Sequence, residues 1–104
     1  MDNYLMHVLL SMYQKPANTG QIYNVTIGRS TPTILYLTEV NGWKLYYGTL
    51  PGLKRNQVEA CQTFFLNQAW LKPHEEKFVL SKQGQSQLDQ YFADPVSYTH
   101  LRAH

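Results

Sequence analysis

The sequence predicts a mostly α-helical domain of the winged helix-turn-helix type, with one small two-stranded β-hairpin. Apolar residues recur at three- and four-residue steps in several segments, which is typical of amphipathic helices. The longest of these segments is followed by two short extended stretches with a charged turn between them, and then by a last helical pattern. This order is that of a helix-turn-helix unit followed by a wing and a closing helix.

Two helices are predicted near the N-terminus. The first covers about residues 3–14, because Asp2 or Asn3 can cap it, apolar residues follow at helical spacing, and a proline beyond it marks its end. The second, about residues 21–27, is brief and stops at Gly28, because glycine commonly closes a helix in the left-handed conformation.

A third helix is predicted for about residues 32–40. Ser30 or Thr31 stands before a proline, and a capping residue followed by proline in the first turn favours a helix start. The β-branched residues of this segment would also suit a strand, so the prediction depends on the cap and on the terminator Asn41-Gly42. The aromatic-rich loop WKLYYGTLPGLK follows, and we expect its rings to pack against the helices.

The clearest amphipathic helix covers about residues 54–69, with apolar side chains on one side and polar ones mostly on the other. Extended stretches at 70–72 and 77–81 follow, joined by a turn at 73–76, and they predict the hairpin. A last helix is predicted for about residues 82–92.

The final ten residues, PVSYTHLRAH, are interpreted as foreign to the domain. Val96 to His104 resemble, residue for residue, one reading frame of a transposase adaptor used in sequencing libraries. We therefore assign residues 1–94 to one domain and residues 95–104 to a non-native tail, and we expect the natural chain to continue beyond the domain. The alternative, in which the histidines at 100 and 104 form a metal-binding pair on a helix, is set aside with the tail.

The charge and the cysteine content narrow the class of protein. Without Arg102, eight Lys and Arg stand against seven Asp and Glu, so the formal charge is 8 − 7 = +1. A nucleic-acid-binding domain more often shows a clustered basic surplus. Cys61 is the only cysteine, no secretory signal pattern is present, and no apolar run approaches ~20 residues. These features predict a cytoplasmic protein without a membrane span.

Residues suited to catalysis are sparse. Outside the tail, His7 lies on an amphipathic helix and His74 in the hairpin turn, and neither belongs to a metal-binding motif. Cys61 lies on the apolar face of the long helix, where a core thiol is expected rather than a reactive thiolate. No glycine-rich phosphate loop is present. The sequence therefore predicts no enzyme, no cofactor and no metal site.

The stretch from residue 22 to residue 55 contains four short motifs in order, Ile22-Tyr23, Gly28-Arg29-Ser30, Thr33-Ile34 and Leu53-Lys54-Arg55. With these motifs the stretch resembles the N-terminal part of the YpbB-like proteins of Firmicutes. The resemblance implies a helix-turn-helix fold and an association with a RecQ-type helicase or with another domain of the same protein. Because the matching motifs are structural, it implies no catalytic residue.

The first functional hypothesis is a protein-interaction module of a helicase-associated protein. Its partner would contact the exposed aromatic side chains Trp43, Tyr46 and Tyr47. An exposed aromatic patch with dispersed charge would favour this hypothesis, and the near-neutral charge already does so.

The second hypothesis is a winged helix-turn-helix domain that binds DNA in transcription or DNA repair. Its reader helix would lie within residues 31–41, although few side chains there can hydrogen-bond to base edges. The expected DNA contacts are Arg29, Ser30, Thr31, Thr33, Lys54, Arg55, Lys72 and Lys77. A clustered basic face would favour this second hypothesis.

Overall fold

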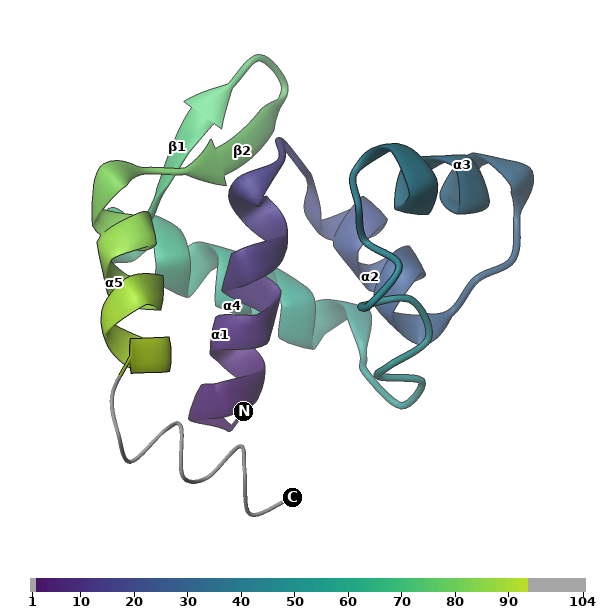
Figure 1. Ribbon diagram of the computed structural model, residues 1–104, viewed down its shortest axis with the longest axis horizontal. Helices are drawn as coiled ribbons and strands as arrows, with labels where there is room; N and C mark the ends of the chain where they lie inside the picture. The colour runs from purple at the N-terminus through teal and green to yellow at the C-terminus, as the bar shows by residue number, and fades with distance from the viewer. Residues whose placement is uncertain (1, 94–104) are drawn as a thin grey trace.

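The computed structural model describes residues 2–93, which form five α-helices and one antiparallel β-hairpin (Figure 1). In chain order the elements are α1 (Asn3–Ser11), the 3-10 turn η1 (Met12–Gln14), α2 (Thr19–Ile27), α3 (Pro32–Val40), α4 (Arg55–Asn67), β1 (Leu71–His74), β2 (Lys77–Leu80) and α5 (Lys82–Ala93). The mostly α-helical class with a two-stranded hairpin is confirmed. The predicted tail, residues 95–104, lies outside the described residues.

Capping explains where the first three helices begin. The Asp2 carboxylate accepts a hydrogen bond from a backbone amide in the first turn of α1, at 2.8 Å. Asn18 and Gln21 form a reciprocal capping box at the start of α2. The Thr31 hydroxyl oxygen caps α3, and Pro32 occupies its first position. The prediction of a helix rather than a strand in this β-branched segment is therefore confirmed.

A single residue before α2 extends the hairpin. Ala17 exchanges two backbone hydrogen bonds with Phe78 of β2, at 2.9 and 3.0 Å, while β1 and β2 pair with each other in antiparallel register. α2 then packs against α4, and α4 leads directly into β1. The series of helices followed by a hairpin and a closing helix is consistent with a winged helix-like domain.

Residues 28–54, which include α3, lie between α2 and α4 in the chain. Figure 1 shows α3 beyond α2, on the side of the molecule away from the hairpin and α5. Both α3 and α4 pack against α2, so the expectation that residues 31–41 supply the second helix stays a prediction. Caps and apolar spacing indicate where a helix lies, whereas the helix that packs beside α2 is decided by contacts distant in sequence.

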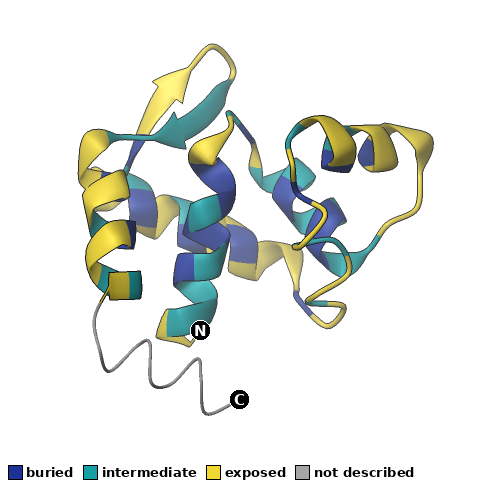
Figure 2. Ribbon diagram, in the orientation of Figure 1, coloured by how far each residue is buried: buried dark blue, intermediate teal, exposed yellow. Residues whose placement is uncertain are grey.

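The hydrophobic core lies where α1, α2 and α4 meet (Figure 2). Its most deeply buried large apolar side chains include Leu9, Leu10, Met12, Tyr13, Ile22, Val25, Val58 and Phe65. From α4, Val58, Cys61 and Phe65 face inward at helical spacing, so the apolar face predicted for the long helix is confirmed for these three residues. Burial of each large apolar side chain stabilises the fold by roughly 1.5–3 kcal/mol.

α5 closes the domain against α1 and the segment that links α4 to β1. The His7 imidazole stacks on the Tyr91 ring, with centroids 3.8 Å apart and an interplanar angle of 7°. The Ser81 hydroxyl donates to the carbonyl before Trp70 at 2.6 Å and accepts from the Gly84 amide at 3.0 Å. These contacts hold the first turn of α5 against the backbone at Trp70.

Candidate functional site

Trp43 belongs to the core and not to the surface. Its side chain is 2% exposed, and the indole Nε1 donates to the Met12 carbonyl oxygen at 3.2 Å. Its backbone amide donates to the Thr38 carbonyl oxygen near the end of α3. The expected packing of the loop rings against the helices is therefore confirmed for Trp43, and the hypothesis that Trp43 contacts a partner from an exposed aromatic patch is wrong, because the indole packs the loop after α3 against the end of α1.

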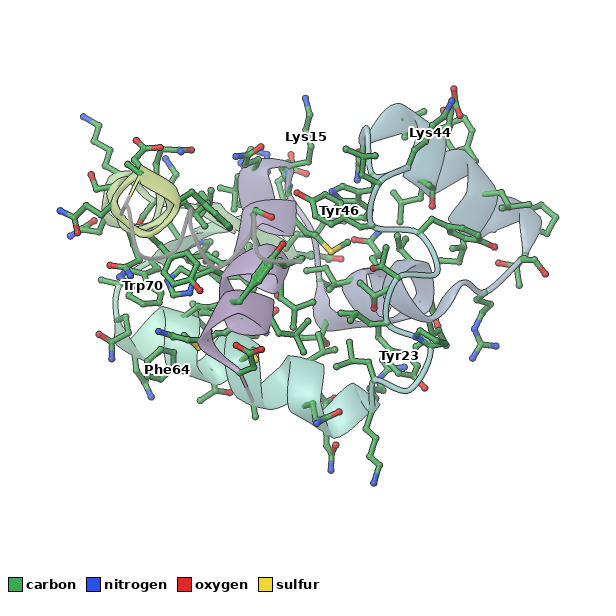
Figure 3. The ribbon with its side chains drawn as sticks, turned by 60° about the horizontal axis from the view of Figure 1, so that its bottom comes forward. Lys15, Tyr23, Lys44, Tyr46, Phe64 and Trp70 are labelled. Carbon is green, nitrogen blue, oxygen red and sulfur yellow. The ribbon has the colours of Figure 1, made fainter. Side chains whose placement is uncertain are left out.

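Tyr46 and Tyr47 are half-buried, and their hydroxyls are engaged within the domain. The Tyr46 hydroxyl lies 2.8 Å from Ser11 Oγ, and the Tyr47 hydroxyl donates to the Gly28 carbonyl oxygen at 3.0 Å. Figure 3 shows Tyr46 where the loop passes α1. Both rings thus position the loop, and their contact with a partner stays a prediction.

An apolar groove lies along the outer side of α1, between the loop after α3 and the end of α5. We name it the α1–α5 groove, and its volume is about 550 Å³. Its apolar lining includes Leu5, Val8, Leu45, Tyr46, Leu50 and Phe92. The Leu45 side chain at this groove is 89% exposed. An apolar concavity that faces water is typical of a surface that binds another molecule.

Sequence analysis did not identify this groove. Leu5 and Val8 follow the same helical spacing as the core residues of α1, so periodicity predicts that they are buried. Leu45 lies in an irregular loop, where spacing carries no information about burial. Only the placement of the loop beside α1 brings these three side chains to one surface.

The outer face of α3 is apolar and has few groups that could read bases. Its exposed side chains include Leu35, Tyr36 and Val40, which are 47%, 70% and 51% exposed. Ile34 and Thr38 are buried on the opposite face. Base edges are read mostly by Arg, Lys, Asn and Gln, so this helix is poorly suited to the reader role expected of it.

The predicted DNA contacts do not gather on one face. The segment before α3 and its first turn carry Arg29, Ser30, Thr31 and Thr33, the start of α4 carries Lys54 and Arg55, and the hairpin carries Lys72 and Lys77. Glu75 and Glu76 form the hairpin turn, and Arg55 lies 3.8 Å from Glu59. Lys44 forms an ion pair with Glu39 at 3.1 Å. Lys44 lies beside α3, far from the part of α4 that carries Phe64 (Figure 3). The charge is therefore dispersed.

The buried histidine has a structural role. His7 is 2% exposed, and its Nδ1 lies 2.7 Å from the Asn3 carbonyl oxygen, so this nitrogen donates. Its Nε2 then accepts from the Gln87 amide at 3.0 Å. Both ring nitrogens are thus used to join α1 to α5. His74 is exposed on the hairpin, as expected from its place in the sequence.

Cys61 and Tyr13 lie together in the core. Burial raises the pKa of the Cys61 thiol. Burial is also the main cause that raises the pKa of the Tyr13 hydroxyl, and the interaction with Cys61 raises it further. A raised pKa and a buried sulfur are opposite to the properties of a reactive cysteine. Among the described residues, no group of three His, Cys, Asp or Glu side chains could hold a metal ion.

These two shifts predict that alkaline pH destabilises the domain. In the unfolded state the cysteine loses its proton near pH 8.5 and the tyrosine near pH 10. Above roughly pH 8.5 this ionisation therefore stabilises the unfolded state relative to the folded state, in which both groups keep their protons to higher pH. We expect the thermal unfolding midpoint to fall between pH 7 and pH 10. The fall should be smaller in Cys61→Ala, and an equal fall in both proteins would contradict the assignment.

Comparison of the chain with protein-family models, with curated proteins and with solved structures finds no match. Within residues 2–93, none of the helices has the length and apolar character needed to cross a membrane.

Proposed function

We propose that this domain is a protein-interaction module of a helicase-associated helix-turn-helix protein, which docks a RecQ-like helicase or another domain of the same protein. The observation that carries the proposal is the α1–α5 groove, with the 89% exposed Leu45 at its side.

The chemistry of the groove supports a protein partner. Leu5 and Val8 lie one turn apart on α1, and together with Phe92 they form an apolar floor that a partner helix could cover. Among the described residues of the lining, Asp2 is the only formally charged one, so the occupant needs an apolar face rather than a charged one. The dispersed lysines and arginines of the described chain also favour a protein over a nucleic acid.

A substitution at Leu45 tests the proposal. Leu45→Asp places a charge in the apolar groove at a position too exposed to affect the core, so we expect binding to a purified RecQ-type helicase to weaken roughly tenfold or more. Isothermal titration calorimetry measures the dissociation constant, and circular dichroism confirms that the fold is unchanged.

The matched control is Tyr36→Asp on the outer face of α3, which should leave the affinity for the helicase within about twofold of the unmodified protein's. Absence of binding by the unmodified protein at 100 µM would contradict docking to such a helicase. A greater loss in Tyr36→Asp than in Leu45→Asp would transfer the docking surface to α3.

A further inference from the structure

The outer face of α3 differs from the exposed faces of α4 and α5. Leu35, Tyr36 and Val40 lie on it, and Tyr36 is the most exposed of the three, at 70%. Glu39 is the only formally charged residue among the nine of α3. The exposed positions of α4 and α5 are mostly polar or charged, as is usual for a helix face in water. Contact with water therefore does not explain the apolar character of this face.

Opposite charges lie at the two ends of the same face. Arg29 is exposed just before α3, and Glu39 is exposed in its last turn. Arg29 donates from Nε to the neutral amide of Asn24 at 2.9 Å, whereas Glu39 forms its ion pair with Lys44. The helix dipole is positive at the N-terminal end and negative at the C-terminal end, so Arg29 and Glu39 each share the sign of their own end. The face thus has a positive end, an apolar middle and a negative end.

We propose that the outer face of α3 binds α3 of a second copy of this chain, with the two helices antiparallel about a two-fold axis. In this arrangement the apolar middles meet, and each positive end lies beside the negative end of the other copy. A parallel arrangement would place like charges together. A symmetric dimer requires a face that is complementary to itself in this way.

The charges favour a second copy over an unrelated protein. Arg29 of each copy would lie beside Glu39 of the other, so that one ion pair flanks the apolar contact on each side. A carboxylate accepts several hydrogen bonds, so Glu39 can keep Lys44 as a partner while it binds the guanidinium. The formal charge of the chain is only +2, which adds little repulsion between two copies.

The position and the length of α3 suit such pairing. Figure 1 shows α3 at one edge of the molecule, away from the hairpin and α5, and Figure 2 shows its outer side as exposed. Ile34 and Thr38 anchor its opposite side in the domain. Its nine residues span about 14 Å, so two such helices form an interface at the small end of the range for specific complexes. We therefore expect a weak dimer that forms at high micromolar concentrations.

Pairing through α3 is separate from the proposed helicase docking. None of the five residues that carry it lines the α1–α5 groove, and these residues are Arg29, Leu35, Tyr36, Glu39 and Val40. Different variants therefore test the two surfaces, and the failure of one proposal leaves the other unchanged.

Sedimentation equilibrium of the full 104-residue chain at about 10–500 µM tests the proposal. The chain has a mass of 12.1 kDa, and we expect the weight-average mass to rise toward twice that value. Tyr36→Asp puts a charge in the apolar middle and should weaken the association at least tenfold. Leu45→Asp, a matched change at the groove, should leave the association constant within about twofold of the unmodified chain's.

Charge exchange tests the pairing of the two ends. Arg29→Glu brings two acidic groups together at each end of the dimer, and Glu39→Arg brings two basic groups together. Each variant alone should therefore associate roughly fivefold more weakly than the unmodified chain. An equimolar mixture of the two restores opposite charges at both ends, so we expect it to associate within about twofold of the unmodified chain. Misfolding of either variant could not produce this recovery.

Three results would overturn the proposal. A chain that stays monomeric at about 500 µM would leave the face of α3 to a different protein. Association that is lost in Leu45→Asp and kept in Tyr36→Asp would place the contact at the groove. A mixture of Arg29→Glu and Glu39→Arg that associates no better than either variant alone would show that the two ends do not pair.

Discussion

Replacing Trp43 by alanine is expected to destabilise the domain by about 3–5 kcal/mol, which is the usual cost of truncating a buried tryptophan. The side chain is 2% exposed, and its loss leaves a cavity between the loop and α1. It also removes the indole donor that serves the Met12 carbonyl. A small domain has a total stability of about 5–15 kcal/mol, so a large share of it would be lost. Urea unfolding followed by far-ultraviolet circular dichroism measures the change.

Leu45→Ala is the matched control, two residues along the same loop. Leu45 is 89% exposed, so we expect a change of no more than about 0.5 kcal/mol in the free energy of unfolding. Stability should thus depend on Trp43, and helicase binding on Leu45. A loss below about 1 kcal/mol in Trp43→Ala would show that the loop does not close on α1 as described.

Replacing Gly84 by alanine should destabilise the domain by about 3 kcal/mol, although the same change within an exposed helix normally stabilises it by up to about 1 kcal/mol. A Cβ at this position would overlap the Trp70 carbonyl oxygen and press on the Leu80 side chain. The Trp70 carbonyl also accepts the Ser81 amide, at 2.9 Å, so the obstructing atoms are backbone held in place. The first turn of α5 would have to move away.

Gly20→Ala in α2 is the control, a glycine-to-alanine change in a helix that should not lower the free energy of unfolding. Its Cβ would meet the end of the Arg55 side chain, which can move aside, so we expect stability to be unchanged or slightly increased. Chemical denaturation of both variants gives the comparison. If Gly84→Ala were as stable as Gly20→Ala, α5 could not lie so close to the segment at Trp70.

Much of the secondary structure was predictable because its signals are local. The capping side chains of Asn18 and Thr31 act within one helical turn, so the residue types at short spacing predict them. The inward face of α4 follows from the spacing of Val58, Cys61 and Phe65. The expected boundaries of the hairpin and of α5 agree with the structure to within two residues at each end.

The candidate surfaces were less predictable. A tryptophan in a polar loop has no periodicity that reports burial, so the sequence could not tell a core Trp43 from an exposed one. The packing of the long helix against α2 likewise has no local signal, because the two segments lie far apart in the chain. In both cases the missing information was a contact between segments more than 25 residues apart, Trp43 with Met12 and α4 with α2.

The sequence by itself determined the helices, the hairpin and the mostly α-helical class, since caps, turns and apolar spacing act over a few residues. The tertiary structure alone decided that α4 packs against α2, although α3 lies between them in the chain. The bridge from Ala17 to Phe78 joins residues 61 positions apart, and the loop at Leu45 meets α1 across about 40 residues. Such contacts form only when the hydrophobic core is assembled, which is why no local sequence pattern predicts them.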